Sequence, residues 1–381
     1  MIVDEFLRWV FRASLSERSD AATALARSYL YSDLDSREAL AVEAALAVLL
    51  DDPQPVIRKR LAETFASHPD APRSILLPLI NDLPEIAEIV LKNSPILADA
   101  ELIDVLAGGQ RRVQIAIANR STLSPALCAA MAEVGMREAC IELLKNPSSR
   151  FSPLSLECLV DRFGEDAELR NILFTYRDLP VTLRHRLLAR LSEALCGMDL
   201  VKNTLSAKRS QDLCREYCDK AALALFGDDY DQNDLIALVE HLKLSDRLTP
   251  ALVLRAACLG NIRFVSAVLA SLSRLSAKKV DGLMKQGTQS AFYTLFSRTD
   301  LPEAAWPALW ASVLVWREIM REDYDLDQAS FARQVLQRIL SMRTGLSDVE
   351  LGQLLSLMRR YVSDSLRESA RNYAEACRQA A

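Results

Sequence analysis

The sequence predicts an all-α protein: an α-α superhelix, or solenoid, of short helical pairs, followed by a second, less regular helical region. Three observations predict this fold class. The 381 residues include only 11 Gly and 14 Pro, too few for the many tight turns of a sheet-rich protein. Ala, Leu, Arg and Glu, which favour helices, are abundant throughout. A unit of about 26 residues repeats in the first half of the chain, as in stacked helical repeats.

The spacing of apolar residues divides the chain into four segments. They are an N-terminal helical cap (1–50), short helical repeats (51–197), a second helical region (198–345) and a C-terminal amphipathic helix (346–381). The cap is expected to contain helices at 2–12, 18–31 and 36–50. Beyond the repeats, we expect helices at 180–196, 208–226, 232–244, 248–259, 261–272, 276–286, 288–298, 302–321, 326–342 and 348–379. The polar stretch 198–211 is the best candidate for a boundary between the two halves.

The repeat is defined by three asparagines, Asn93, Asn119 and Asn146, which lie 26 and 27 residues apart. Each follows the end of an apolar helix and precedes a short polar turn and a second apolar helix, and His68 takes the same place one unit earlier. Asn tolerates the left-handed backbone that ends many helices, so we expect it to terminate the first helix of each pair.

The second helix of a pair is expected to start at Ser124-Pro125 or Ser152-Pro153, because Ser accepts an unpaired N–H and Pro fits the first helical position. Pairs this short cannot bury their own apolar faces and must stack on their neighbours. The segment 51–63 opens the array and looks like the first helix of a HEAT-type repeat, so the solenoid is expected to be HEAT-like.

Several short motifs resemble those of a bacterial, mostly alphaproteobacterial, family that carries domain of unknown function 2336. The matching residues are Ser94, Pro95 and Leu97; Ala116, Ile117, Ala118 and Arg120; Leu143, Leu144 and Asn146; Asp178, Leu179 and Pro180; and Leu248, Thr249, Leu252, Arg255, Cys258 and Gly260. The resemblance covers about residues 45–320 and implies a HEAT-like helical fold. Because the family has no established biochemical role, it implies no catalytic or binding residue.

Composition and charge favour a soluble protein of the cytoplasm. The net charge of −5 gives no general reason to expect a polyanionic partner. The N-terminal segment carries Asp4 and Glu5 where a signal peptide would be basic. The longest apolar runs, 44–50 and 306–316, are shorter than the roughly 20 residues of a membrane span. The eight cysteines form no C-x-x-C pair, so we expect reduced thiols.

Two patterns invite a metal-site interpretation. Cys214 and Cys218 share a helix face and could begin a zinc site, but we favour the alternative that both are buried thiols. Acidic and amide residues of 229–240 match ligand positions of an EF-hand loop, but Asp234 stands where that loop needs Gly. The favoured alternative is an acidic helix start capped by Asp231 or Asn233. We therefore expect no metal and no cofactor.

Nucleophilic catalysis has little support in the sequence. The three histidines, His68, His185 and His241, lie in no recognisable nucleophile setting, and neither a G-x-S-x-G elbow nor a phosphate-binding glycine motif occurs. Gly108-Gly109 is typical of a helix end. The chain is therefore not expected to be an enzyme.

Several arginines are candidates for an interaction surface. They could line one concave face and bind nucleic acid, or they could be solvated cations scattered over helix exteriors, which we favour. The candidate residues are Arg58, Arg60, Arg111, Arg112, Arg184 and Arg186.

Two apolar features could serve an interface or the core. Trp306 and Trp310 share a helix face and are favoured as core. The apolar stripe of 348–379 could dock on the chain, which we favour, or pair two subunits.

These observations favour a non-catalytic protein-interaction scaffold or regulatory adaptor, and we expect its partner to be another protein. A nucleic-acid-binding or repair-type protein is the alternative, and a regulatory protein that dimerises through its last helix is a third hypothesis.

Overall fold

The computed structural model describes residues 6, 8–10, 12–198, 206–225, 231–322, 326–342 and 345–380. Throughout this described part the regular structure is helical and contains no strand, which confirms the all-α prediction. The chain forms two compact units, Met1–Leu179 and Pro180–Ala381, which we describe separately. None of the described helices is long and apolar enough to cross a membrane.

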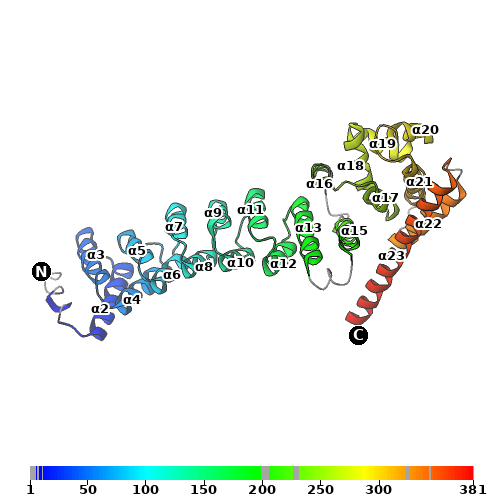
Figure 1. Ribbon diagram of the computed structural model, residues 1–381. Helices are drawn as coiled ribbons and strands as arrows, with labels where there is room; N and C mark the ends of the chain where they lie inside the picture. The colour runs from blue at the N-terminus through cyan, green and yellow to red at the C-terminus, as the bar shows by residue number, and fades with distance from the viewer. Residues whose placement is uncertain are drawn as a thin grey trace. The chain divides into compact units, whose positions relative to one another are not determined.

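The first unit is a stack of helix pairs arranged in two rows (Figure 1). One row contains α2 (Leu15–Tyr31), α4 (Pro55–Phe65), α6 (Pro84–Asn93), α8 (Arg111–Ala118), α10 (Arg137–Lys145) and α12 (Ala167–Thr175). The other row contains α3 (Ser36–Leu50), α5 (Arg73–Ile80), α7 (Asp99–Ala107), α9 (Pro125–Val134) and α11 (Pro153–Phe163). Each helix of the first row packs against the next one in that row, so the predicted helical-repeat arrangement is confirmed.

One continuous apolar core runs through these pairs from the N-terminal helices to α10. Phe65 of α4, Val90 of α6 and Ile117 of α8 are each 0% exposed. Helices of two or three turns are marginal in isolation, so burial between successive pairs supplies most of their stability. The expected helix at 2–12 lies largely outside the described residues.

The predicted start signals of the second-row helices are confirmed. Ser124 and Ser152 are the N-caps of α9 and α11, and their hydroxyl oxygens accept hydrogen bonds from the backbone N–H groups of Leu127 and Ser155. Pro follows each of them at the first helical position. Helix α7 ends at Gly108, and Gly109 has a φ of 71°, a value that favours glycine.

The repeat asparagines end their helices as predicted, but the left-handed backbone expected there is wrong. None of Asn93, Asn119 and Asn146 has a positive φ. Their side-chain amides act instead: Asn93 and Asn119 each donate to the carbonyl one turn earlier in their own helix. The Asn146 amide donates across to the previous pair, to the carbonyls of Ala118 and Arg120, both at 2.8 Å. Because a side chain satisfies the carbonyls, a left-handed residue is unnecessary.

Two arginines also connect successive pairs through backbone carbonyls. Arg120 is buried and donates to the carbonyls of Leu91 and Ser94, one pair earlier. Arg162 of α11 donates to the carbonyls of Ala132 and Gly135 at the end of α9. The last carbonyls of a helix have no partner within it, so these contacts satisfy groups that stacking would otherwise bury unpaired.

The second unit is helical but less regular (Figure 1). Its helices are α13 (Val181–Gly197), α15 (Ala207–Leu225), α16 (Gln232–Leu244), α17 (Pro250–Cys258), α18 (Ile262–Ser273), α19 (Ala277–Gln286), α20 (Gln289–Phe296), α21 (Trp306–Glu322), α22 (Gln328–Ser341) and α23 (Asp348–Ala380), with the 3-10 turn η1 (Glu303–Ala305). The polar stretch predicted as a boundary lies partly outside the described residues, and α13, which precedes it, packs against α15 within the second unit.

The core of this unit contains both apolar features that the sequence left open. Trp310 is 5% exposed and stacks on Trp306, with ring centroids 5.9 Å apart, so the core interpretation is correct. The first half of α23 docks on the same core through Leu354, Met358 and Tyr361. The helix is exposed toward its end, where Tyr373 is 75% exposed.

Asn146 gives a direct test of the stacking interactions. Replacing Asn146 with Ala removes two hydrogen bonds to the previous pair and should lower the local free energy of unfolding by about 2 kcal/mol. Asn93→Ala, whose lost hydrogen bond lies within one exposed helix end, should cost at most about 0.5 kcal/mol. Hydrogen exchange of α8 and α10 peptides in increasing urea measures both, and equal losses would contradict the assigned role.

Candidate functional site

The four candidate arginines of the first unit are all paired with carboxylates. Arg58 makes a bidentate contact with Asp82, at 2.6 and 2.9 Å, and also donates to a backbone carbonyl of the preceding loop. This guanidinium lowers the pKa of Asp82. Arg112 binds Glu88 at 2.6 Å and Glu85 at 3.1 Å. Arg60 contacts a glutamate on its own helix, and Arg111 lies 3.5 Å from a carboxylate oxygen of α10.

The pairs of Arg58 and Arg112 belong to a ladder that links each helix of the first row to an adjacent pair. Its members are Arg18 with Asp52, Arg58 with Asp82, Arg112 with Glu85 and Glu88, and Arg137 with Asp166 and Glu168. Most of these guanidinium groups are positioned by two oxygens, a geometry that fixes orientation as well as charge. The cations of this edge therefore already have anionic partners inside the protein.

Arg184 and Arg186 lie elsewhere, on α13 in the second unit, where they flank the buried His185. The structure thus brings Arg111 and Arg112 together at one surface and leaves the α13 pair on a different unit.

A groove follows the loops that lead into α6 and α8. It combines an open depression of about 680 Å³, lined by Leu83, Pro84, Glu85, Gln110, Arg111 and Arg112, with a smaller one of about 170 Å³ between the ends of α5 and α7. Gln110 lines both parts. We call this surface the loop-edge groove. It offers apolar atoms from Leu83 and Pro84 beside two arginines.

Exposed apolar side chains continue along the edge at which the first-row helices begin. Leu83 is 47% exposed immediately before α6, Val56 is 49% exposed in the first turn of α4, and Met136 is 41% exposed immediately before α10. Single exposed apolar residues are ordinary, but a row beside a groove is typical of a surface that binds a partner. The sequence analysis predicted the arginines of this surface as candidates but not the row of apolar side chains. Whether an apolar side chain is exposed depends on how the helix pairs stack.

The second unit contains a cleft of about 600 Å³ between α13, α15 and the loop after α16. We call it the disulfide cleft, because Cys196 of α13 and Cys214 of α15 form a disulfide on its wall, with their Cα atoms 6.6 Å apart. The expectation of reduced thiols is therefore wrong for these two cysteines, whose proximity depends on helix packing. Of the pair proposed as buried thiols, Cys214 is bonded and half-buried, while Cys218 is free and buried.

Two histidines that the sequence left unassigned meet beside this region. The rings of His185 and His241 lie 5.5 Å apart in an edge-on arrangement. His185 is 4% exposed, and its Nδ1 has no hydrogen-bond partner among the described residues. Burial, with smaller contributions from His241 and Arg247, lowers the pKa of His185 to about 4. The imidazole is thus neutral at physiological pH.

Asp231 caps α16 by accepting a hydrogen bond from the backbone N–H of Asp234 at 2.8 Å. The preferred interpretation of 229–240 as a capped helix start is confirmed for this residue. Asp229, the first residue of the segment that matches an EF-hand loop, lies outside the described residues.

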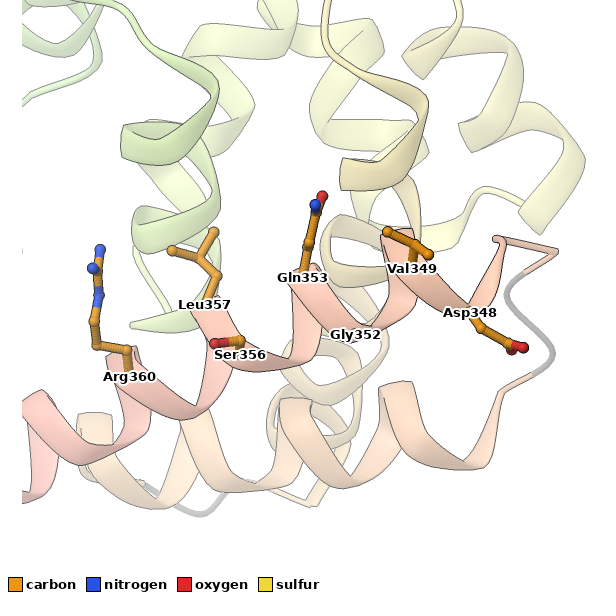
Figure 2. Close-up of a pocket in the computed structure, with 7 residues that line it drawn as sticks. All are labelled: Asp348, Val349, Gly352, Gln353, Ser356, Leu357 and Arg360. Carbon is orange, nitrogen blue, oxygen red and sulfur yellow. The ribbon is translucent and has the colours of Figure 1, made fainter.

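A shallow hollow of about 510 Å³ follows the exposed side of α23 (Figure 2). All of its lining residues belong to this one helix, and Val349, Gln353 and Leu357 stand in a row on it. A strip on a single helix encloses no ligand. Dimerisation through α23 stays a prediction.

Acidification tests the neutral state of His185. Its pKa is 6.5 when exposed and about 4 in the folded chain, so the unfolded state binds more protons between these values. The contribution of His185 to the free energy of unfolding of the second unit should be fully present above pH 6.5. It should fall by up to about 3 kcal/mol as the pH approaches 4. Urea unfolding at several pH values checks this, and His185→Leu should flatten the dependence more than His68→Gln.

The comparisons with known proteins agree with the resemblance noted from the motifs. No curated protein and no solved structure matches the chain. The sequence model of one bacterial family, described as "Uncharacterised protein conserved in bacteria (DUF2336)", matches residues 86–347. This match spans both units and more than half of the sequence. The chain therefore belongs to the DUF2336 family of bacterial proteins.

Proposed function

We propose that this chain is a non-catalytic protein-interaction scaffold of the cytoplasm, which binds a segment of another protein in the loop-edge groove. The observation that supports this most is the combination of exposed apolar atoms from Leu83 and Pro84 with arginines whose charges are already paired. Interfaces between proteins typically surround an apolar centre with polar groups and favour Arg among the charged residues.

The partner segment is proposed to combine an apolar side chain with a nearby carboxylate. The apolar side chain would contact Leu83, which is 47% exposed. Arg111 is the most accessible cation of the groove, with a side chain 64% exposed and a carboxylate of its own protein 3.5 Å away. A surface ion pair of this kind contributes little energy, so a partner carboxylate can replace it at low cost.

Nucleic acid is the less favoured alternative. Binding to a phosphate backbone gains its energy from neutralising phosphates and releasing their counterions. Along the first-row edge, Arg58, Arg112 and Arg137 already hold carboxylates, so phosphates would have to displace those groups. The acidic net charge of −5 adds a general repulsion.

Leu83→Ser tests the groove without weakening its helix. Leu83 is the N-cap of α6, and Ser is preferred at that position, so the substitution removes the exposed apolar side chain while offering the helix a cap. Full-length wild-type and variant chains serve as bait for native cytoplasm, and the captured proteins are quantified by mass spectrometry. We expect Leu83→Ser to reduce capture of the specific partner about tenfold, from the lost apolar contact.

Leu154→Ser is the matched control. Leu154 is 76% exposed near the start of α11, in the other row, and should leave capture unchanged. Urea unfolding should show both variants folded. Equal capture by all three chains would contradict binding in the loop-edge groove, and capture that disappears after nuclease treatment would favour the nucleic-acid alternative.

A further inference from the structure

The disulfide cleft has the features of a chemical site that the scaffold function does not use. The Cys196–Cys214 bond joins α13 to α15, and both cysteines are half-buried on the wall of an open cleft of about 600 Å³. Both residues are thus partly exposed where they line the cleft. Disulfides that are exposed are the ones that exchange readily with thiols, whereas structural disulfides are shielded.

A third cysteine lies one helical turn away. Cys218 follows Cys214 by four residues on α15, so the two share a face of the helix and line the same cleft. Burial raises the pKa of the Cys218 thiol, and the nearby Arg247 partly opposes this. Cys218 is thus a neutral thiol beside the bond at physiological pH.

Arg247 connects the two walls of the cleft. Its Nη1 lies 3.9 Å from the sulfur of Cys218 on α15, and its Nη2 donates to the Glu193 carboxylate on α13 at 3.0 Å. The guanidinium reaches this position from a tight turn in which Asp246 has a φ of 54°. A cation that lines a cleft with sulfur atoms favours a thiolate over a thiol there.

We propose that the Cys196–Cys214 disulfide is a thiol-exchange site, opened in the folded protein by a low-molecular-weight thiol that enters the cleft. The incoming thiolate attacks one of the two sulfurs and forms a mixed disulfide, while the bond between the cysteines breaks and its electron pair leaves with the other sulfur as a thiolate. A second small thiolate then attacks the small-molecule sulfur of the mixed disulfide. A small disulfide forms, and the bond to the protein breaks with its electron pair leaving on the cysteine as a thiolate. The two cysteines are reduced and take up two protons, and two small thiols are oxidised.

Opening the bond is compatible with the fold of the second unit. Helices α13 and α15 also pack against each other without it, and the Ser192 hydroxyl of α13 donates to the Cys214 carbonyl at 3.0 Å. Two buried cysteines, Cys140 and Cys258, contrast with this pair. Burial raises the pKa of Cys140 to about 11 and that of Cys258 to about 12, which keeps both thiols protonated and unreactive.

The test uses the full-length chain with reduced glutathione as the probe and no denaturant. Samples are taken over time, free thiols are blocked by excess N-ethylmaleimide at neutral pH without denaturant, and peptides are mapped by mass spectrometry. Before glutathione, the peptides of Cys196 and Cys214 should be linked. With it, a glutathione adduct on one of them should appear and then give way to both cysteines blocked, while Cys140 and Cys258 stay unlabelled and the far-UV circular dichroism is unchanged.

Two results would overturn the proposal. A bond that glutathione opens only after urea has unfolded the chain would make it a structural disulfide. Blocking of Cys196 and Cys214 in an air-oxidised sample without any reductant would show that the bond does not persist in the folded protein. Neither result bears on partner capture by the loop-edge groove, so this proposal and the scaffold function fail independently.

Discussion

The structure of the first unit depends on one constraint: helix pairs of two or three turns cannot bury their apolar faces without a neighbour. Residues such as Phe65, Val90 and Ile117 are fully buried only because successive pairs stack. Stacking also brings helix ends together, and their unpaired carbonyls then need donors. Asn146, Arg120 and Arg162 supply these donors from the next pair, so the same step that buries apolar area also requires the polar contacts between pairs.

The same constraint shapes the surface. A carboxylate and an arginine at corresponding places in successive pairs come within hydrogen-bond distance, as Arg58 and Asp82 do, and their charges are neutralised inside the array. Apolar residues at the helix starts, such as Leu83, have no such partner and stay exposed. Stacking thus pairs the arginines of this edge with carboxylates and leaves its apolar side chains exposed. Such an edge favours a protein partner over a polyanion.

The sequence predicted the helices of both units closely, because apolar periodicity and Ser-Pro starts are local properties. It also predicted the core position of Trp310 and the docking of α23. The motif from Leu248 to Gly260 is structural: Thr249 caps α17, and Gly260 has a φ of 79° where Phe331 packs against it. Arg255 of this motif is buried and binds Glu216 and Asp364. The sequence did not predict the hydrogen bonds of the Asn146 side chain, because their carbonyl acceptors belong to the previous helix pair and the sequence of one repeat does not show which carbonyls lie nearby.

The sequence also did not predict the disulfide cleft, because the cleft depends on how separate helices pack. The place where it forms indicates where reactive side chains can meet in this chain. In a regular stack, equivalent polar positions meet equivalent partners, and the arginines of the ladder link pairs in this way. The second unit lacks this regularity, and three segments that are separate in sequence meet at Cys196, Cys218 and Arg247 without filling the space between them. Reactive side chains that face an open cleft therefore gather where the repetition ends, while the repeating part offers a surface suited to binding.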